Sequence, residues 1–236
     1  MRTTTTTEDL LTNQSPDTPE KYVGIEVECY SGAGESVVMG KLLNSSIKDY
    51  VTIGEDSSVE YPYSGNNRDY EFRILVPVSQ LRTVLTGVCA FLKDIKAKVN
   101  ASCGLHVHLD MRSHDVSKAF YNLAVSEKLL MSCVKEARRK STYCHPVNST
   151  SYKKAIEEHT KYRTINASAY NEHKTLEVRV HHGSVKFEEI YPWTKVLVAL
   201  AYGPKLAEGQ ALSTLPLALR KWVRERRALY PMKLAA

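Results

Sequence analysis

Four stretches of the chain alternate apolar residues with polar or charged ones, which is the pattern of strands that bury one face. They are rich in β-branched and aromatic residues, and Gly, Pro, Asn or Asp bounds each of them. The predicted strands are Tyr22 to Tyr30, Tyr70 to Val76, Leu105 to Met111 and Thr175 to His181. Because side chains two residues apart point to the same face of a strand, each stretch separates an apolar face from a polar one.

Other stretches place apolar residues at intervals of three and four, which predicts amphipathic helices. We expect one helix between Pro77 and Val99, a second from Asp115 to about Arg138, and a third from about Lys186 to Tyr202. The helices and strands follow one another without a regular βα repeat. The predicted fold class is therefore α+β rather than a doubly wound α/β sheet.

Composition adds a division of the chain into three parts. The 236 residues are 43% hydrophobic and 25% charged, which is typical of a globular protein with one domain. Residues 1–20 are Thr-rich, then acidic, with few apolar side chains, and we expect them to be a disordered leader. Residues 21–210 would form the folded domain, and residues 211–236 a basic amphipathic helix or tail.

The net charge of +6 is concentrated near the C-terminus, where five basic residues and one acidic residue lie between Arg220 and Arg227. A nucleic-acid-binding stripe is one interpretation of this segment. Apolar residues recur through it at helical spacing, however, and no base-reading motif accompanies the charges. The pattern favours a helix whose basic face is solvated.

The chain contains no run of 18 apolar residues, and its N-terminus lacks the apolar core of a signal peptide. These features predict neither a membrane span nor secretion, and we expect the protein in the cytoplasm. The five cysteines are widely spaced and include no Cys-x-x-Cys pair. They indicate reduced thiols rather than a disulfide framework or a cysteine zinc site.

The polar faces of the four predicted strands carry the candidate chemistry. They hold Glu26 and Glu28; Glu71 and Arg73; His106, His108 and Asp110; and Glu177, Arg179 and His181. Taken singly, each pattern has an ordinary explanation, such as solvated glutamates, histidines without a metal, or an ion pair on a wet surface. Together they describe a polar floor. Carboxylates held close need a counter-charge, for which Mg²⁺ or Mn²⁺ is suited, and arginines among them would pair with phosphate oxygens.

Several phosphate-binding and nucleophile motifs are missing from the sequence. It has no Gly-x-x-x-x-Gly-Lys-Ser/Thr loop and no Gly-x-Ser-x-Gly elbow, and Gly32-Ala-Gly34 lacks the third glycine of a dinucleotide fingerprint. The adjacent Cys144 and His145 have poor geometry for a nucleophile and its base. Phosphate binding would therefore depend on metal ions and side chains.

Successive motifs resemble those of the amidoligase family, a branch of the carboxylate-amine ligase superfamily that includes glutamine synthetase and glutamate-cysteine ligase. In order, they are Gly24-Ile-Glu26-Val-Glu28, Glu55-Asp56-Ser57-Ser58, Glu71-Phe-Arg73, Cys103-Gly-Leu-His106-Val-His108, Tyr162-Arg163-Thr-Ile-Asn166 and Thr175-Leu-Glu177-Val-Arg179. The chain departs from the family pattern after Ser58 and after Glu71.

The resemblance implies a curved, mainly antiparallel sheet with helices packed on its outer face, as in the catalytic domain of glutamine synthetase. ATP and Mg²⁺ (or Mn²⁺) would lie in the concavity. The implied metal ligands are Glu26, Glu28, Glu71, His106 and Glu177. The implied phosphate contacts are His108 and Arg179, with Arg163 and Asn166 on the transferred phosphate or the substrate carboxylate, and Asp56 and Ser58 on the acceptor side.

The implied reaction is ATP-dependent amide formation between a carboxylate and an amine, each a small molecule or a peptide, through an acyl phosphate. The loop from about Lys140 to Ser151 would close over the site, and in so short a chain substrate recognition would depend on a homo-oligomer or on a partner. Two alternatives remain. One is a zinc hydrolase that uses His106, His108 and a glutamate, which would not need Arg163 and Arg179. The other is a non-catalytic binding protein on the same fold.

Overall fold

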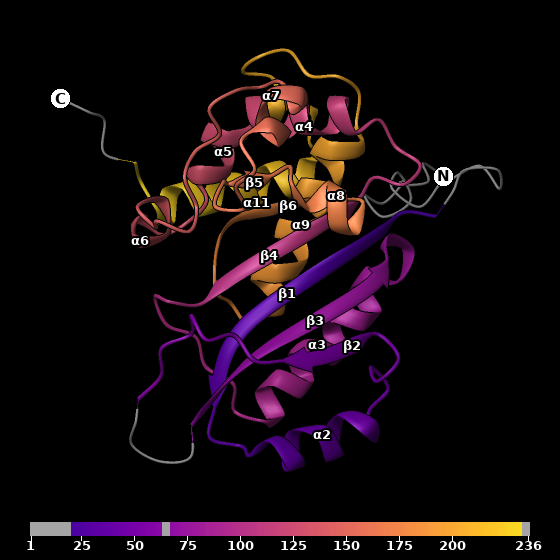
Figure 1. Ribbon diagram of the computed structural model, residues 1–236, viewed down its shortest axis with the longest axis vertical. Coiled ribbons are helices and arrows are strands. Elements are labelled where there is room, and N and C mark those ends of the chain that lie inside the picture. Colours follow the sequence, from indigo (N-terminus) through magenta and orange to yellow (C-terminus); the bar gives the residue numbers. More distant parts are fainter. Residues whose placement is uncertain (1–19, 63–66, 233–236) are drawn as a thin grey trace, which may run out of the picture.

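An open antiparallel sheet is the centre of the computed structural model, which describes residues 20–62 and 67–232. In the described part of the chain, the six strands lie in the order β2-β3-β1-β4-β6-β5 (Figure 1). Their bounds are β1 Tyr22–Ser31, β2 Val51–Gly54, β3 Arg68–Pro77, β4 Gly104–Asp110, β5 Ile165–Asn166 and β6 Thr175–His182. The α+β class and the four predicted strands are confirmed, whereas the short strands β2 and β5 were not predicted.

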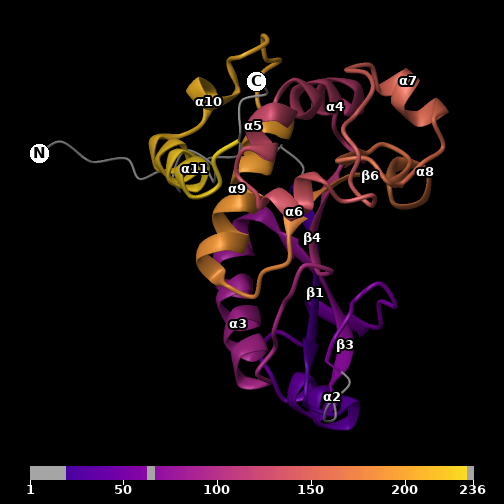
Figure 2. The same ribbon diagram turned by 90° about the vertical axis from the view of Figure 1, so that its left-hand side faces the viewer.

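Two long helices cover one face of the sheet, as the side view shows (Figure 2). They are α3, Leu81–Asp94, which follows the 3₁₀ turn η1 (Val78–Gln80), and α9, Phe187–Tyr202. Both were predicted, and the apolar residues that define the helical spacing of α3, among them Leu85 and Leu92, are fully buried. Residues 1–19, which make up all but the last position of the expected leader, lie outside the described residues.

The helix predicted from Asp115 to Arg138 is wrong as a continuous element. It is divided into α4 (Val116–Val125), α5 (Glu127–Met131) and α6 (Glu136–Arg139). At the breaks, the Ser126 hydroxyl donates to the Asn122 carbonyl at 2.6 Å and the Ser132 hydroxyl donates to the Leu129 carbonyl at 2.6 Å. Serine hydroxyls that bond the preceding turn compete with the backbone ladder and favour helix ends.

The remaining helices lie around the sheet. They are α2 Glu35–Leu43, α7 Tyr152–Glu157, α8 Ala169–His173, α10 Ala211–Thr214 and α11 Leu217–Leu229. The basic C-terminal segment forms α11, which lies against α9 with Leu219 and Val223 buried. The division of the chain at residues 20 and 210 stays a prediction. None of the helices in the described ranges is long and apolar enough to cross a bilayer.

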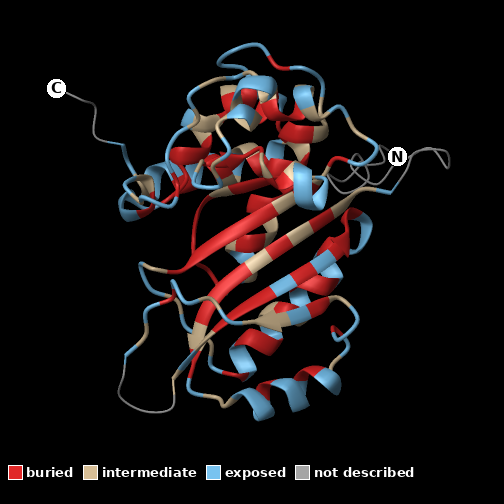
Figure 3. Cartoon of the chain, in the orientation of Figure 1, coloured by how far each residue is buried: buried red, intermediate tan, exposed pale blue. Residues whose placement is uncertain are grey.

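The two faces of the sheet differ in chemistry, as the alternation predicts. Val23, Ile25 and Val107 are fully buried beneath α3 and α9, and buried and less buried residues alternate along β1 (Figure 3). The polar positions between them lie on the opposite, open face. This open face holds the candidate chemistry.

A β-bulge changes the alternation in β6. Leu105 pairs with His181, but Val107 pairs with Val178, so β6 has one residue more than β4 over this interval. Glu177, opposite His108, stays on the open face. His181 instead points to the core, where its ring centroid lies 4.8 Å from that of Trp193 in α9. The expectation that Glu177, Arg179 and His181 share one face is therefore wrong for His181.

Candidate active site

The strand register brings polar side chains from distant parts of the sequence into neighbouring rows. Directly opposite residues of paired strands share a face. Glu28 lies opposite Glu71, and Glu26 lies between Arg73 and His106. The result is a continuous polar surface across β3, β1, β4 and β6.

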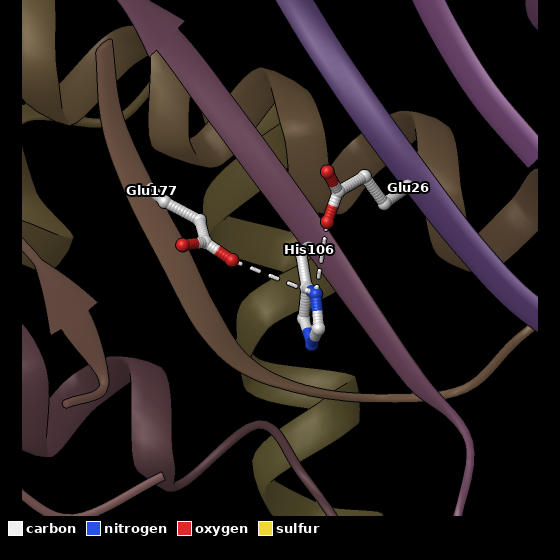
Figure 4. Close-up of side chains that lie close together, drawn as sticks. All are labelled: Glu26, His106 and Glu177. Carbon is white, nitrogen blue, oxygen red and sulfur yellow. Dashed lines mark hydrogen bonds and ion pairs between the residues drawn. The ribbon is translucent and has the colours of Figure 1, made fainter. Parts of the chain in front are cut away.

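Three residues from three strands form the first ligand group, Glu26, His106 and Glu177 (Figure 4). The Nδ1 atom of His106 lies 3.1 Å from Glu26 Oε2 and 3.6 Å from Glu177 Oε1. One donor atom from each residue lies within 4.8 Å of the other two. This geometry suits one divalent cation held by two carboxylates and an imidazole.

A second ligand group consists of Glu28, Asp56 and Glu71, whose donor oxygens also lie within 4.8 Å of one another. Glu28 is 3% exposed, and its Oε2 accepts a hydrogen bond from the Gly104 amide at 2.6 Å. Asp56 was expected on the acceptor side of the reaction, and the structure places its carboxylate beside two predicted metal ligands. Three carboxylates without a nitrogen or sulfur donor fit a hard cation such as Mg²⁺ or Mn²⁺.

The glutamates of the two groups differ in their electrostatics. Burial alone would raise the pKa of Glu26, but hydrogen bonds with His106 and His108 hold it well below its usual range. Burial opposes ionisation of Glu177 as well, yet His106 and Arg179 lower its pKa. Glu71 behaves differently, because burial and the nearby Glu26 charge raise its pKa. A bound cation would relieve the repulsion that Glu71 experiences.

His108 lies one row further along β4. Its Nδ1 is 3.0 Å from Thr175 Oγ1, and its Nε2 is 3.3 Å from Glu26 Oε1 and 3.9 Å from Glu177 Oε1. Burial would lower the pKa of His108, but the hydrogen bond with Glu26 and the charge of Glu177 raise it. An imidazole with a raised pKa can contribute positive charge at this side of the site.

Cationic and amide side chains are interleaved with the carboxylates. The Arg179 guanidinium pairs with Glu177 Oε1, and the Asn166 amide donates to Glu177 Oε2 at 2.7 Å. The Arg73 guanidinium pairs with Glu71 in the same way. The short strand β5 thus brings Asn166 to the site, although its two residues gave no strand signal in the sequence.

The side chains of two predicted site residues, Arg163 and Ser58, make no hydrogen bond or ion pair with either ligand group. Arg163 donates from Nε to Glu158 Oε2 at 2.7 Å and from Nη1 to the Pro146 carbonyl at 3.0 Å. Ser58 is exposed, and its amide donates to Asp56 Oδ1 at 2.8 Å. Their roles on the substrate stay predictions.

One residue that lies beside the site was not predicted from the sequence. Arg138 of α6 is 6% exposed, and its Nη2 lies 3.1 Å from His106 Nε2 and donates to the Arg179 carbonyl at 2.7 Å. The guanidinium thereby joins β4 to β6 beside the bulge. The only signal in the sequence was an arginine at the end of an apolar helical pattern, which is too common to single out.

Comparison with protein families identifies the class of this chain. A family model described as "putative amidoligase enzyme" matches residues 19–167, more than half of the sequence, and indicates an enzyme of the ligase class. The chain belongs to the amidoligase family. A comparison with curated proteins finds no match. Glu177 and Arg179 lie beyond the matched residues, and β6 brings them to the site through its pairing with β4.

Proposed function

We propose that the protein is an ATP- and Mg²⁺-dependent ligase that joins a carboxylate to an amine through an acyl phosphate. The observation that carries the proposal is the pair of ligand groups side by side on the open sheet face of an amidoligase-family chain. The proposal includes a sheet equivalent to that of the glutamine synthetase catalytic domain.

The two ligand groups have separate tasks in this proposal. The first group (Glu26, His106 and Glu177) and the second group (Glu28, Asp56 and Glu71) would each hold one divalent cation. Cations held by these residues would supply positive charge that stabilises the negative charge developing during phosphoryl transfer. The mixed nitrogen and oxygen donors of the first group also suit Mn²⁺.

The other polar side chains would bind and orient the reactants. His108 and Arg179 are next to the first ligand group, where they can contact phosphate oxygens. Asn166 fixes the Glu177 carboxylate and, with Arg163, is proposed for the transferred phosphate or the substrate carboxylate. Asp56, with Ser58 beside it, is proposed for the amine side.

The reaction follows from the leaving groups. An oxygen of the substrate carboxylate attacks the γ-phosphorus, and ADP leaves with the electrons of the broken P–O bond. The amine then attacks the acyl carbon and inorganic phosphate leaves, whereas direct amide formation would have to expel hydroxide. The proton of the attacking amine passes to a carboxylate such as Asp56. Water must be excluded meanwhile, for which the loop from about Lys140 to Ser151 is proposed as a lid.

The second ligand group favours a ligase over a zinc hydrolase. Zinc prefers nitrogen and sulfur ligands and needs only one site with an open position for water. A hydrolase that uses His106 and His108 has no need of three further carboxylates with no nitrogen among them. Each group also has three donor residues, which disfavours a non-catalytic binding protein on the same fold.

A trapping assay tests the proposal without knowledge of the natural amine. Hydroxylamine attacks acyl phosphates and gives hydroxamates that form coloured iron complexes. With ATP, Mg²⁺ and a panel of carboxylic acids, we expect ADP and one hydroxamate in equal amounts. Glu177→Gln keeps the size of a side chain that is 4% exposed but removes its charge, so activity should fall by roughly 100-fold or more.

The matched control is Glu172→Gln on α8, where the side chain is 79% exposed. This variant should form hydroxamate at the wild-type rate. Hydroxamate formation by a folded Glu177→Gln protein at the wild-type rate would overturn the assignment of the open face as the active site.

A further inference from the structure

The basic helix α11 takes no part in the candidate active site. Five basic residues and one acidic residue between Arg220 and Arg227 contribute +4 of the net charge of +6, so most of the excess positive charge lies on about two turns of this helix. The apolar residues Leu219 and Val223 are buried where α11 packs on α9. The helix is thus fixed to the fold, and its charges have a defined place.

One of the arginines in α11 has a structural task. Arg226 is 7% exposed, and its Nη1 lies 3.1 Å from Glu189 Oε1 of α9 while its Nη2 donates to the Tyr230 hydroxyl at 3.2 Å. Trp222 Nε1 also donates to the Glu188 carbonyl at 3.1 Å. These polar contacts attach the buried side of α11 to the fold without help from the other arginines.

Three other arginines form a row along α11. Arg220, Arg224 and Arg227 are spaced by four and three residues, which puts them on one side of the helix over a length of about 10 Å. None of them makes an ion pair with a carboxylate in residues 20–62 and 67–232. Arg224 and Arg227 are exposed, and Arg220 is partly exposed. We call these three residues the arginine row.

The stability of the helix does not explain the arginine row. Positive charge is favourable in the last turn of a helix, which accounts for Arg227 but not for Arg220 in the first turn. Like charges four residues apart, such as Arg220 and Arg224, repel each other. Lys221 adds a charge beside the row, because its pair with Glu225, at 4.0 Å, is exposed and neutralises little. Unneutralised charges that oppose helix stability indicate a ligand with negative charges.

A phosphate backbone fits the arginine row. Duplex nucleic acid carries one charge per about 1.7 Å of its axis, so a row of this length faces several phosphates. The guanidinium fork binds phosphate oxygens with two hydrogen bonds. A helix that binds a membrane surface needs apolar residues along its exposed side, but the exposed Leu217 and Leu229 of α11 lie at its two ends, about 18 Å apart.

We propose that the arginine row of α11 binds the phosphate backbone of duplex nucleic acid, independently of base sequence. This goes beyond the solvated basic face that the sequence favoured. α11 packs on α9, which covers the core face of the sheet (Figure 2), so a duplex bound there lies away from the ligand groups of the open face. The inference does not depend on the proposed function, because neither ATP nor a divalent cation takes part.

The salt dependence of binding tests the proposal. The full chain is titrated into a fluorescently labelled DNA duplex of mixed sequence, about 20 base pairs long, and anisotropy is measured with EDTA present. Three phosphate contacts predict a slope of about −2.7 for the logarithm of the binding constant against the logarithm of salt concentration. The affinity should therefore fall roughly 40-fold between about 50 and about 200 mM salt.

Removal of the arginine row should abolish this dependence. The variant combines Arg220→Gln, Arg224→Gln and Arg227→Gln, and it keeps Arg226 and the helix propensity, since Gln and Arg are similar helix formers. We expect its affinity to fall about tenfold or more at low salt and its slope to approach zero. Arg224→Gln alone changes one exposed residue and should reduce the slope by about one, which tests the row even if the triple variant does not fold.

The matched control removes three positive charges elsewhere. Lys153→Gln, Lys154→Gln and Lys161→Gln replace exposed lysines on α7 and shortly after it. This variant should keep the wild-type slope, and an equal loss of affinity would show that net charge rather than the arginine row attracts the duplex.

Two further outcomes would overturn the proposal. One is a wild-type slope near zero, or no binding of the duplex at low salt. The other is binding of polyglutamate or of anionic lipid vesicles that is as tight as binding of the duplex and is lost with the arginine row. That result would assign the row to an acidic protein or to a membrane surface.

Discussion

On the open face, neighbouring basic side chains balance the negative charge of individual carboxylates. Glu26 and Glu177 are each held ionised by neighbouring imidazole or guanidinium groups, and their pKa values lie below the usual range. Glu71 is the exception, since burial raises its pKa despite its pairing with Arg73. On acidification Glu71 is therefore the first of these three carboxylates to take up a proton, which would weaken the second ligand group before the first.

His182, the last residue of β6, shows the opposite situation, because its surroundings disfavour its charged form. Burial and the positive charge of Lys135 lower the pKa of His182 to about 4, although Glu189 lies 3.7 Å away and partly opposes this. Arg226 Nη2, at 3.4 Å from His182 Nε2, adds to the positive surroundings. The folded protein therefore keeps this imidazole neutral.

This difference predicts a loss of stability in mild acid. An unfolded histidine titrates near pH 6.5, so below that pH the unfolded chain binds a proton that folded His182 refuses until about pH 4. The free energy of unfolding should fall as pH decreases through this window. Urea unfolding measured near pH 7 and about pH 5 should show a smaller difference for His182→Gln than for the wild type. An exposed histidine, His145, provides the control, and an unchanged pH dependence in His182→Gln would contradict the account.

At the scale of elements, the alternation of apolar and polar residues in the sequence was sufficient to predict the long strands. β1, β3, β4 and β6 each bury the apolar residues of one face, so their apolar periodicity reports directly on packing. β2 and β5 have four and two residues, too few for a period of two to stand out. They form because neighbouring strands offer free ladder positions, which is information that local sequence does not contain.

The bulge in β6 shows where strand alternation fails to predict the arrangement of the site. Strict alternation puts His181 beside Glu177 and Arg179, but the extra residue turns His181 to the core. Gly24 lies inside a strand pattern and could have served as a signal from the sequence. Glycine in a strand often marks a place where another group approaches the backbone closely. Arg138 reaches the site through tertiary packing and carried no such signal, while Asp56 was expected there only from the family resemblance, on the acceptor side.

The start of α4 supplies a test at the level of one element. The Asp115 side chain accepts a hydrogen bond from the Lys118 amide at 2.9 Å and caps the helix. Asp115→Ala should lower the free energy of unfolding by about 1 kcal/mol, and Asp115→Asn should recover most of that loss. Urea unfolding of the three proteins measures the difference. Equal stability of Asp115→Ala and the wild type would show that the cap contributes nothing.

At the scale of the whole molecule, the order of strands creates the site. The ligand groups combine residues from position 26 to position 177, and the sheet order β3-β1-β4-β6 makes them neighbours. Apart from His181, the sequence predicted which face each candidate side chain would occupy on its own strand. It did not determine which strands would be adjacent, and the family resemblance implied only that these residues share a metal site on one antiparallel sheet.

The basic helix α11 lies apart from this surface. It packs on α9, the helix that covers the core face of the sheet (Figure 2), whereas the ligand groups occupy the open face. Lys221 is 78% exposed. Lys221→Ala combined with Arg224→Ala should leave the affinity for a non-hydrolysable ATP analogue unchanged, as measured by calorimetry with Mg²⁺ present. A large loss of affinity would show that α11 acts on the site.

The central claim is that the open face binds a nucleotide through divalent cations. Its most direct test is calorimetric titration of a non-hydrolysable ATP analogue, with and without Mg²⁺, into the wild type and a Glu26→Gln, Glu28→Gln variant. The account predicts binding that requires Mg²⁺ and is lost in the variant, which keeps its fold because both substitutions preserve side-chain size. Binding that is independent of Mg²⁺ and unchanged in the variant would contradict it, as would a wild-type protein that binds no nucleotide and is purified with one tightly held zinc ion.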